Sequence, residues 1–205
     1  MESLGKIFGS IGRIKIMRMF LFNSAQSFDI DTVVSRTRLK RVDARKELTM
    51  LTKIGFLRKK DFIKKTTKEK KGEKKPVIVK KKVSGWALNR RFELIEPLQQ
   101  LLIDRDLINE KLLVSKIRKA GSIKLLLLSG IFTRDDNRKL DILVVGNRLK
   151  KDILEEYMLV LESEIGRELR YAFFSEQEYE YRLSMYDKLI RDSLENEHIS
   201  LINSL

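Results

Sequence analysis

The positive charge of this chain is concentrated in its first half. Residues 1–91 hold 26 Lys and Arg against 8 Asp and Glu, a net charge of +18, whereas residues 92–205 hold 17 against 21, a net charge of −4. Concentrating like charge in one half costs self-repulsion that an even distribution avoids, so solubility alone does not explain it. The asymmetry predicts two domains with different partners and a boundary near residue 91. The excess of positive charge makes an acidic polymer or surface the first partner to consider.

Composition excludes several classes of function. The 205 residues are 42% hydrophobic, enough for two small cores, but they include no cysteine and one histidine, His198. Disulfides, thiolate metal sites and His-based triads are therefore not expected, nor is a cofactor. The sequence also lacks an apolar run of the roughly 18 to 20 residues that span a membrane, and a secretory signal. We expect a cytoplasmic protein with no membrane partner.

A lysine-rich block dominates the charge of the first half. Lys59–Lys82 contains 12 lysines in 24 residues. Its middle, TTKEKKGEKK from Thr66, has almost nothing apolar to bury, which predicts a solvated loop. The flanking segments FLRKKDFIKK and PVIVKKKVSGWAL interleave β-branched or aromatic residues with lysine, which predicts two strands of a hairpin.

Three helices are expected before this hairpin. Leu4–Phe22 is dense enough in apolar residues for one buried helix. Residues 29–37 form a short helix candidate with Asp29 as its N-cap. The third helix ends at Gly55 and has an apolar face. That face consists of Leu39, Ala44, Leu48 and Leu51.

The opposite face of the third helix is basic. Arg41 and Arg45 lie one turn apart, Thr49 follows, and Val42 and Lys46 lie on the flank. In a major groove, Arg reaches guanine O6 and N7 or phosphate, and Val touches a thymine methyl. An isolated basic face is usually only solvated, so the neighbouring elements decide between the two interpretations.

Helix, helix, tight turn, basic helix and lysine-rich hairpin resemble a winged helix-turn-helix transcriptional regulator over roughly residues 4 to 90. The resemblance implies that residues on and before the third helix face DNA: Arg38, Lys40, Arg41, Val42, Arg45 and Lys46. It also implies a wing tip at residues 64–75, with Lys64, Lys65, Lys68, Lys70, Lys71, Lys74 and Lys75 beside an adjacent groove. Many winged helices bind proteins instead, but the charge of +18 favours double-stranded DNA.

The second half alternates helices and strands. Two amphipathic helices are expected in residues 92–103 and 105–120, the first of them linking the domains over residues 92–104. Strands at 123–130 and 139–146, a helix at 151–166, a strand at 168–175 and a terminal helix at 176–194 follow. This order predicts a small α/β domain with a mixed sheet over residues 105–205, and an α+β fold for the whole chain.

This order resembles a minimal nucleotidyltransferase of the DNA polymerase beta-like superfamily over roughly residues 105 to 195. Active members carry a Gly-Ser pair after the first strand, an Asp-x-Asp pair on the second, and often a third carboxylate. Here the corresponding residues are Ser129-Gly130, Lys139-Leu140-Asp141 and Arg170. One acid remains in register, and Lys139 and Arg170 would repel the two Mg²⁺ ions that such sites hold. We therefore expect a degenerate domain without catalytic or metal-binding residues.

The sequence as a whole favours a transcriptional regulator whose second domain serves dimerisation or ligand sensing. An active nucleotidyltransferase acting on nucleic acid or a partner protein is the alternative, and a non-specific binder of nucleic acid or anionic membranes is a third. A homodimer is expected, because paired half-sites increase specificity. An apolar helical stripe would either form the dimer contact or belong to the core: Leu94, Leu98, Leu101 and Leu102.

Overall fold

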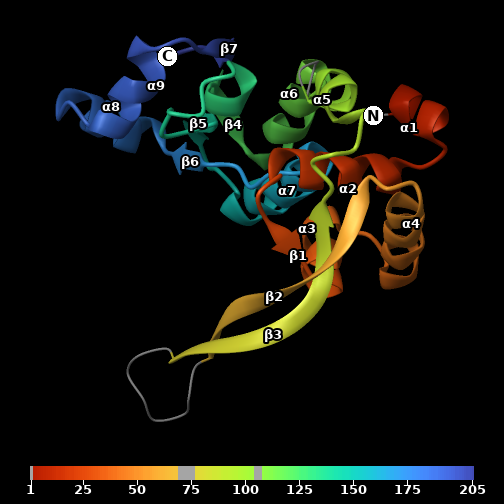
Figure 1. The fold of residues 1–205 in the computed structure, drawn as a ribbon. Helices are drawn as coiled ribbons and strands as arrows, with labels where there is room; N and C mark the ends of the chain where they lie inside the picture. Colours follow the sequence, from red (N-terminus) through yellow and green to blue (C-terminus); the bar gives the residue numbers. More distant parts are fainter. Residues whose placement is uncertain (1, 69–76, 104–107) are drawn as a thin grey trace. The chain divides into compact units, whose positions relative to one another are not determined.

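The computed structural model describes residues 2–68, 77–103 and 108–205. It has an α+β fold with one three-stranded and one four-stranded sheet, as expected from the sequence (Figure 1). Its contacts divide it into two compact units, Met1–Arg105 with Ser163–Arg167, and Asp106–Glu162 with Glu168–Leu205. Within the described ranges, no helix is long and apolar enough to cross a membrane.

The first unit begins with two helices where the apolar density predicted one. Helix α1 spans Glu2–Phe8 and helix α2 spans Ile11–Phe22. Gly9 separates them with a φ of 72°, and the Ser10 side chain accepts a hydrogen bond from Arg13 N at 3.2 Å. The single-helix prediction was wrong because a left-handed glycine and an N-cap serine start a new helix whatever the apolar content around them.

The next two helices form as their sequences predict. Helix α3 spans Ile30–Thr37, and its N-cap Asp29 accepts from Thr32 N at 3.0 Å. Helix α4 spans Arg41–Lys53 and buries Ala44, Leu48 and Leu51 completely. Gly55, with a φ of 85°, turns the chain from α4 into the next strand. The apolar face of α4 therefore fixes which of its residues remain exposed.

A long hairpin follows α4. Strands β2 (Leu57–Lys68) and β3 (Val77–Leu88) pair antiparallel without a register shift, and β1 (Ser27–Phe28) pairs with the base of β3. The sheet order is β1-β3-β2. Figure 1 shows the hairpin extending away from β1 and from the helices α3 and α4 of its own unit. The strands reach further than predicted, since Thr66–Lys68 belong to β2.

Helix α5 (Ile95–Leu102) belongs to the first unit rather than standing as a separate linker. Leu102 is fully buried in the core of this unit, and Leu98 packs against the same core. Leu94 and Leu101 are exposed. The leucine stripe is thus divided between core and surface.

The second unit is built on a mixed sheet of order β6-β5-β4-β7. Its strands are β4 (Ser122–Leu128), β5 (Ile142–Asn147), β6 (Tyr171–Phe174) and β7 (Ile199–Asn203). β4 is antiparallel to β5 and β7, and β5 is parallel to β6. The predicted mixed sheet is confirmed, but β7 was not predicted.

Four helices accompany this sheet in the described residues: α6 (Glu110–Ile117), α7 (Lys151–Ile165), α8 (Glu176–Ser184) and α9 (Lys188–Glu195). Two short 3₁₀ turns join them, η1 (Arg118–Ala120) and η2 (Gly130–Phe132). Residues of α8 and α9 pack on one face of β4 and β5, where Tyr179 and Ile190 join Leu125, Leu127 and Leu143. The prediction of one terminal helix over 176–194 was wrong. Tyr186 has a φ of 54°, and the Asp187 side chain caps α9 by accepting from Leu189 N at 2.7 Å.

Candidate functional site

The outward face of α4 carries the residues predicted to meet DNA. Ala44, Leu48 and Leu51 point into the core, and the residues of this helix that were predicted to meet DNA are exposed: Arg41, Val42, Arg45, Lys46 and Thr49. Val42 is 78% exposed. The face therefore combines cations with one accessible apolar group.

Two further predicted residues lie in the turn between α3 and α4. Arg38 ends α3 with a φ of 55°, and Lys40 is the residue before the first turn of α4. Both are exposed. The turn thus extends the basic surface of α4 at its N-terminal end, where the helix dipole also favours an anion.

Two carboxylates near the start of α3 form ion pairs with predicted DNA-binding residues, one in α4 and one in the hairpin. Asp31 forms an ion pair with Arg41, the first residue of α4. Asp29 forms an ion pair with Lys64 of β2, whose Nζ lies 2.8 Å from Asp29 Oδ2 and 3.0 Å from Thr32 Oγ1. Neither ion pair could be predicted from the sequence, because α3, α4 and β2 meet only in the folded unit.

Asp29 is held ionised by its surroundings. Burial acts to raise its pKa, but hydrogen bonds from Lys64 and from the side chain and backbone of Thr32 outweigh it and hold the pKa of Asp29 below the ordinary 3.8. Its carboxylate caps α3 and anchors the hairpin at once. The middle of β2 is therefore fixed to α3 by a charged group.

The hairpin brings lysines opposite one another. In the β2–β3 register Lys64 faces Lys81 and Lys65 faces Lys80. Like charges directly opposite in an antiparallel pair destabilise it. Lys65, Lys80 and Lys81 are exposed, and Lys80 and Lys81 were not among the residues predicted to meet DNA. Lys80 and Lys81 belong to the same lysine-rich block, but the contacts to DNA were expected in the loop between the strands.

The lysines predicted at the tip of the wing do not all lie there. Lys64 and Lys65 lie within β2 rather than at its tip, and Lys68 is the last residue of β2. The others, Lys70, Lys71, Lys74 and Lys75, lie outside the residues that the structure describes.

In the second unit the single in-register acid is enclosed by donors. Asp141 is fully buried, and Arg170 Nη2 and Nε lie 2.8 Å and 3.0 Å from its Oδ1 and Oδ2. The backbone N–H groups of Ile131 and Arg170 donate to the same carboxylate at 3.0 Å and 2.8 Å. Hydrogen bonds to Asp141 raise the pKa of the Arg170 guanidinium against the effect of burial. Four donors therefore satisfy this carboxylate within the chain.

Ser129 and Gly130 lie beside the segment that carries Asp141. The Ser129 hydroxyl donates to Leu140 O at 2.7 Å, and Ser129 N donates to Asp141 O at 2.9 Å. Gly130 has a φ of 58°, and a Cβ placed on it would lie 2.1 Å from Asp141 Oδ1. Gly130 therefore allows the chain to pack closely on the Asp141 carboxylate, and Ser129 binds the backbone of Leu140 and Asp141.

Lys139 does not join this cluster. Its side chain is exposed, and its backbone N donates to Asp192 Oδ2 at 2.9 Å. Asp135 and Asp192 both pair with Arg138, at 2.6 Å and 3.5 Å, so these nearby acids are bound to a cation as well. In the described part of the chain, no group of three or more acids or histidines is arranged to hold a metal ion.

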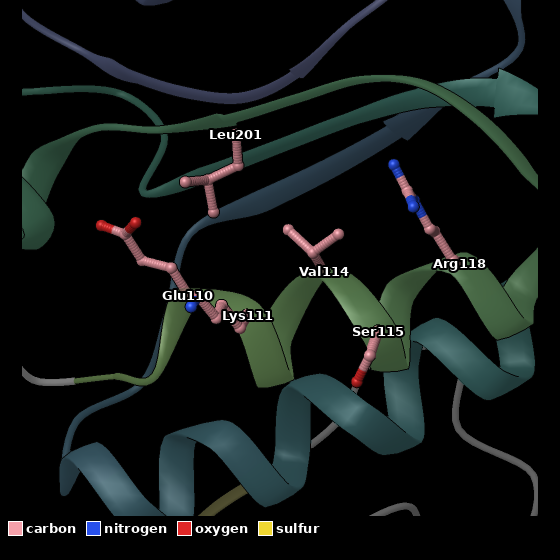
Figure 2. A pocket seen from close by; sticks show the side chains of 6 residues that line it. All are labelled: Glu110, Lys111, Val114, Ser115, Arg118 and Leu201. Carbon is pink, nitrogen blue, oxygen red and sulfur yellow. The ribbon is translucent and has the colours of Figure 1, made fainter.

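The second unit also has a groove of about 400 Å³ beside α6. In Figure 2, Val114 and Leu201 lie between α6 and β7, and Glu110, Lys111 and Arg118 lie along the helix. The Ser115 hydroxyl donates to Leu112 O at 2.8 Å. No predicted site residue lines this groove, and its mixed charges indicate no particular ligand.

The structure thus groups the predicted residues in two places. The cations of α4 and the hairpin lie in the first unit, and Ser129, Gly130, Asp141 and Arg170 lie together in the second. No family model, curated protein or solved structure matches this chain.

Proposed function

We propose that this chain is a DNA-binding transcriptional regulator in which α4 enters the major groove and the β2–β3 hairpin contacts the phosphate backbone. The observation that carries the proposal is the division of α4 into two faces. Ala44, Leu48 and Leu51 are fully buried, and this burial directs Arg41, Arg45 and Lys46 outward. A helix held in this way presents base-reading side chains from a fixed scaffold.

The hairpin supports a polyanionic partner. The facing pair Lys65/Lys80 carries a repulsion that a phosphate would relieve, whereas Lys64 is already paired with Asp29. Helix, strand, helix, helix and hairpin follow one another in the first unit in the order that led to the winged-helix resemblance. Lysine-rich strands attached to a basic helix suit a duplex, which offers both a groove and a backbone.

Val42 favours base reading over non-specific attraction. A surface that only attracts phosphates or anionic lipids needs cations and no patterned apolar group. Here a 78% exposed valine lies between Arg41 and Arg45 along α4, as a contact to a thymine methyl requires. We therefore place sequence-specific binding ahead of the non-specific binder.

The second unit is proposed to act by binding or assembly rather than by nucleotidyl transfer. This proposal is supported by Asp141, whose two oxygens already accept four hydrogen bonds, two of them from the Arg170 side chain. Incubating the chain with labelled nucleoside triphosphates and Mg²⁺ or Mn²⁺ tests the alternative. Label transfer that disappears in Asp141→Asn would establish an active nucleotidyltransferase.

A homodimer and a cytoplasmic location remain predictions. The exposed Leu94 and Leu101 leave a smaller apolar surface than the full leucine stripe for a twofold contact. Light scattering of the full chain at micromolar concentration measures the oligomeric state. A monomer would remove the expectation of a palindromic site.

The proposed function is tested by equilibrium binding of the full chain to a duplex selected from a random library. Arg45→Ala should lose roughly 1 to 3 kcal/mol on the selected duplex and little on a shuffled one. Lys151→Ala removes one exposed cation from the second unit and serves as the control for net charge. Failure to bind any duplex at about 50 mM salt, or equal losses in both variants, would overturn the proposal.

A further inference from the structure

The start of α3 carries two carboxylates, and each binds a cation from a different part of the proposed DNA-binding surface. Asp29, the N-cap, binds Lys64 of the hairpin, and Asp31, in the first turn, binds Arg41 of α4. All four residues belong to the first unit. The free chain therefore already pairs two of its basic groups with internal anions.

The two pairs differ in how firmly they are built. The Asp29 side chain is 11% exposed, and its Oδ1 also accepts from Thr32 N at 3.0 Å. The side chains of Asp31 and Arg41 are 66% and 49% exposed. An exposed pair of this kind shifts an equilibrium by only about 1.5- to 5-fold. The Asp29–Lys64 pair is thus structural, whereas the Asp31–Arg41 pair is easily exchanged.

From this contrast we propose that Asp31 is a specificity-determining residue, which keeps Arg41 from contacting DNA until a matching base is present. The inference rests on the proposed function. Exchanging a carboxylate for a phosphate replaces one anionic acceptor with another, so a non-specific complex gains little by separating the pair. A bidentate contact to a guanine discriminates by about 5- to 150-fold, which exceeds the strength of the pair.

Removing the charge of Asp31 should therefore affect the two kinds of complex unequally. In Asp31→Asn the Arg41 side chain is free to contact phosphates on any sequence. The salt slope of binding to a shuffled duplex should steepen by about 0.9, the value for one further phosphate. Affinity for the shuffled duplex should rise more than affinity for the selected one, so that their ratio falls about two- to five-fold.

Asp43→Asn is the matched control. Asp43 is exposed, lies in the first turn of α4 two residues from Arg41, and forms no ion pair with another described residue. The Asp43→Asn substitution therefore removes one negative charge from the same surface, as Asp31→Asn does, but it does not release Arg41. Asp31→Glu retains the charge and should retain the wild-type ratio.

The experiment measures binding of the full-length variants to the selected and the shuffled duplex at several salt concentrations, with thermal unfolding to verify folding. Arg41→Ala supplies the second test, since in that background Asp31→Asn should no longer steepen the slope. Equal effects of Asp31→Asn and Asp43→Asn, or an unchanged ratio, would overturn the inference while the proposed function stands. A wild-type chain that binds neither duplex would overturn both.

Discussion

The guanidinium of Arg170 donates to both carboxylate oxygens of Asp141, from Nε to Oδ2 at 3.0 Å and from Nη2 to Oδ1 at 2.8 Å. Asp141 is fully buried, whereas the Arg170 side chain is 36% exposed. Arg170 Nη1 also donates to the carbonyl oxygens of Asp136 and Arg138. This one side chain therefore ties the loop before β5 to the segment that leads into β6.

Arg170→Leu should destabilise the second unit by about 2 to 4 kcal/mol. The substitution leaves a buried carboxylate without its cation, and the value falls below that of a fully enclosed pair because Arg170 is partly exposed. Amide hydrogen exchange in β4 and β5 measures the loss, since Trp86, the single tryptophan, reports on the first unit. Lys139→Ala, which removes an exposed cation nearby, should change stability by less than about 0.5 kcal/mol. Equal effects would show that Arg170 matters only as a surface charge.

Gly130→Ala should destabilise the same unit more than its backbone conformation alone explains. A left-handed residue other than glycine costs about 1 to 2 kcal/mol, and here the new Cβ would also lie 2.1 Å from Asp141 Oδ1. Gly55→Ala is the control, because Gly55 is also left-handed but a Cβ placed on it would lie 3.9 Å from Phe92 Cδ2, an ordinary contact distance. Unfolding in urea compares them. Equal losses of unfolding free energy in Gly130→Ala and Gly55→Ala would mean that Asp141 moves away from the new Cβ at no cost.

Lys80→Glu should strengthen the hairpin and weaken binding to DNA. Glutamate at this position would face Lys65 and replace a repulsive pair with an attractive one, a gain of about 0.2 to 1 kcal/mol. Trp86 fluorescence during urea unfolding reports the stability of this unit, and the salt slope of duplex binding should fall by about 0.9 for one lost phosphate contact.

Lys59→Glu makes the same charge change opposite Trp86 and should not stabilise the hairpin. A Lys80→Glu chain that is more stable and binds duplex DNA as the wild type does would place the DNA contact elsewhere.

Asp29→Asn should remove a pH-dependent part of the first unit's stability. The folded-state pKa of Asp29 lies below its ordinary 3.8, so the carboxylate stabilises the fold above that value and loses its contribution as pH falls through the lower, folded pKa. Asparagine still caps α3 but forms no ion pair with Lys64. The difference in unfolding free energy between wild type and Asp29→Asn should therefore be constant near pH 6 and shrink below about pH 4. A difference that does not change down to pH 2 would contradict the role of the charge.

Local signals predicted the elements near the candidate DNA-binding surface correctly. Asp29 precedes an apolar helical pattern, and both the N-cap and the helix are present. The period of Ala44, Leu48 and Leu51 determined which face of α4 is buried, and so which residues are exposed. Both signals act within a few residues, which is why one sequence suffices to detect them.

Long-range pairing could not be predicted in the same way. The ion pairs of Asp29 with Lys64 and of Asp31 with Arg41 join residues 35 and 10 positions apart. Strand β7 escaped prediction because its residues alternate weakly and its role depends on β4, more than 70 positions earlier. The charge of Arg170 was noticed, but the enclosure of Asp141 by four donors depends on three segments that only folding brings together.

The position of β7 at the sheet edge has a consequence for synthesis. β7 pairs with Leu125–Leu128, four successive leucines whose strand would otherwise end the sheet. An apolar strand with unpaired N–H and C=O groups is a template for joining other chains. A chain synthesised only as far as residue 198 lacks the five residues of β7, Ile199–Asn203, and still presents that template. Variants that weaken β7 should therefore lower the yield of soluble protein before they change the measured affinity of the first unit.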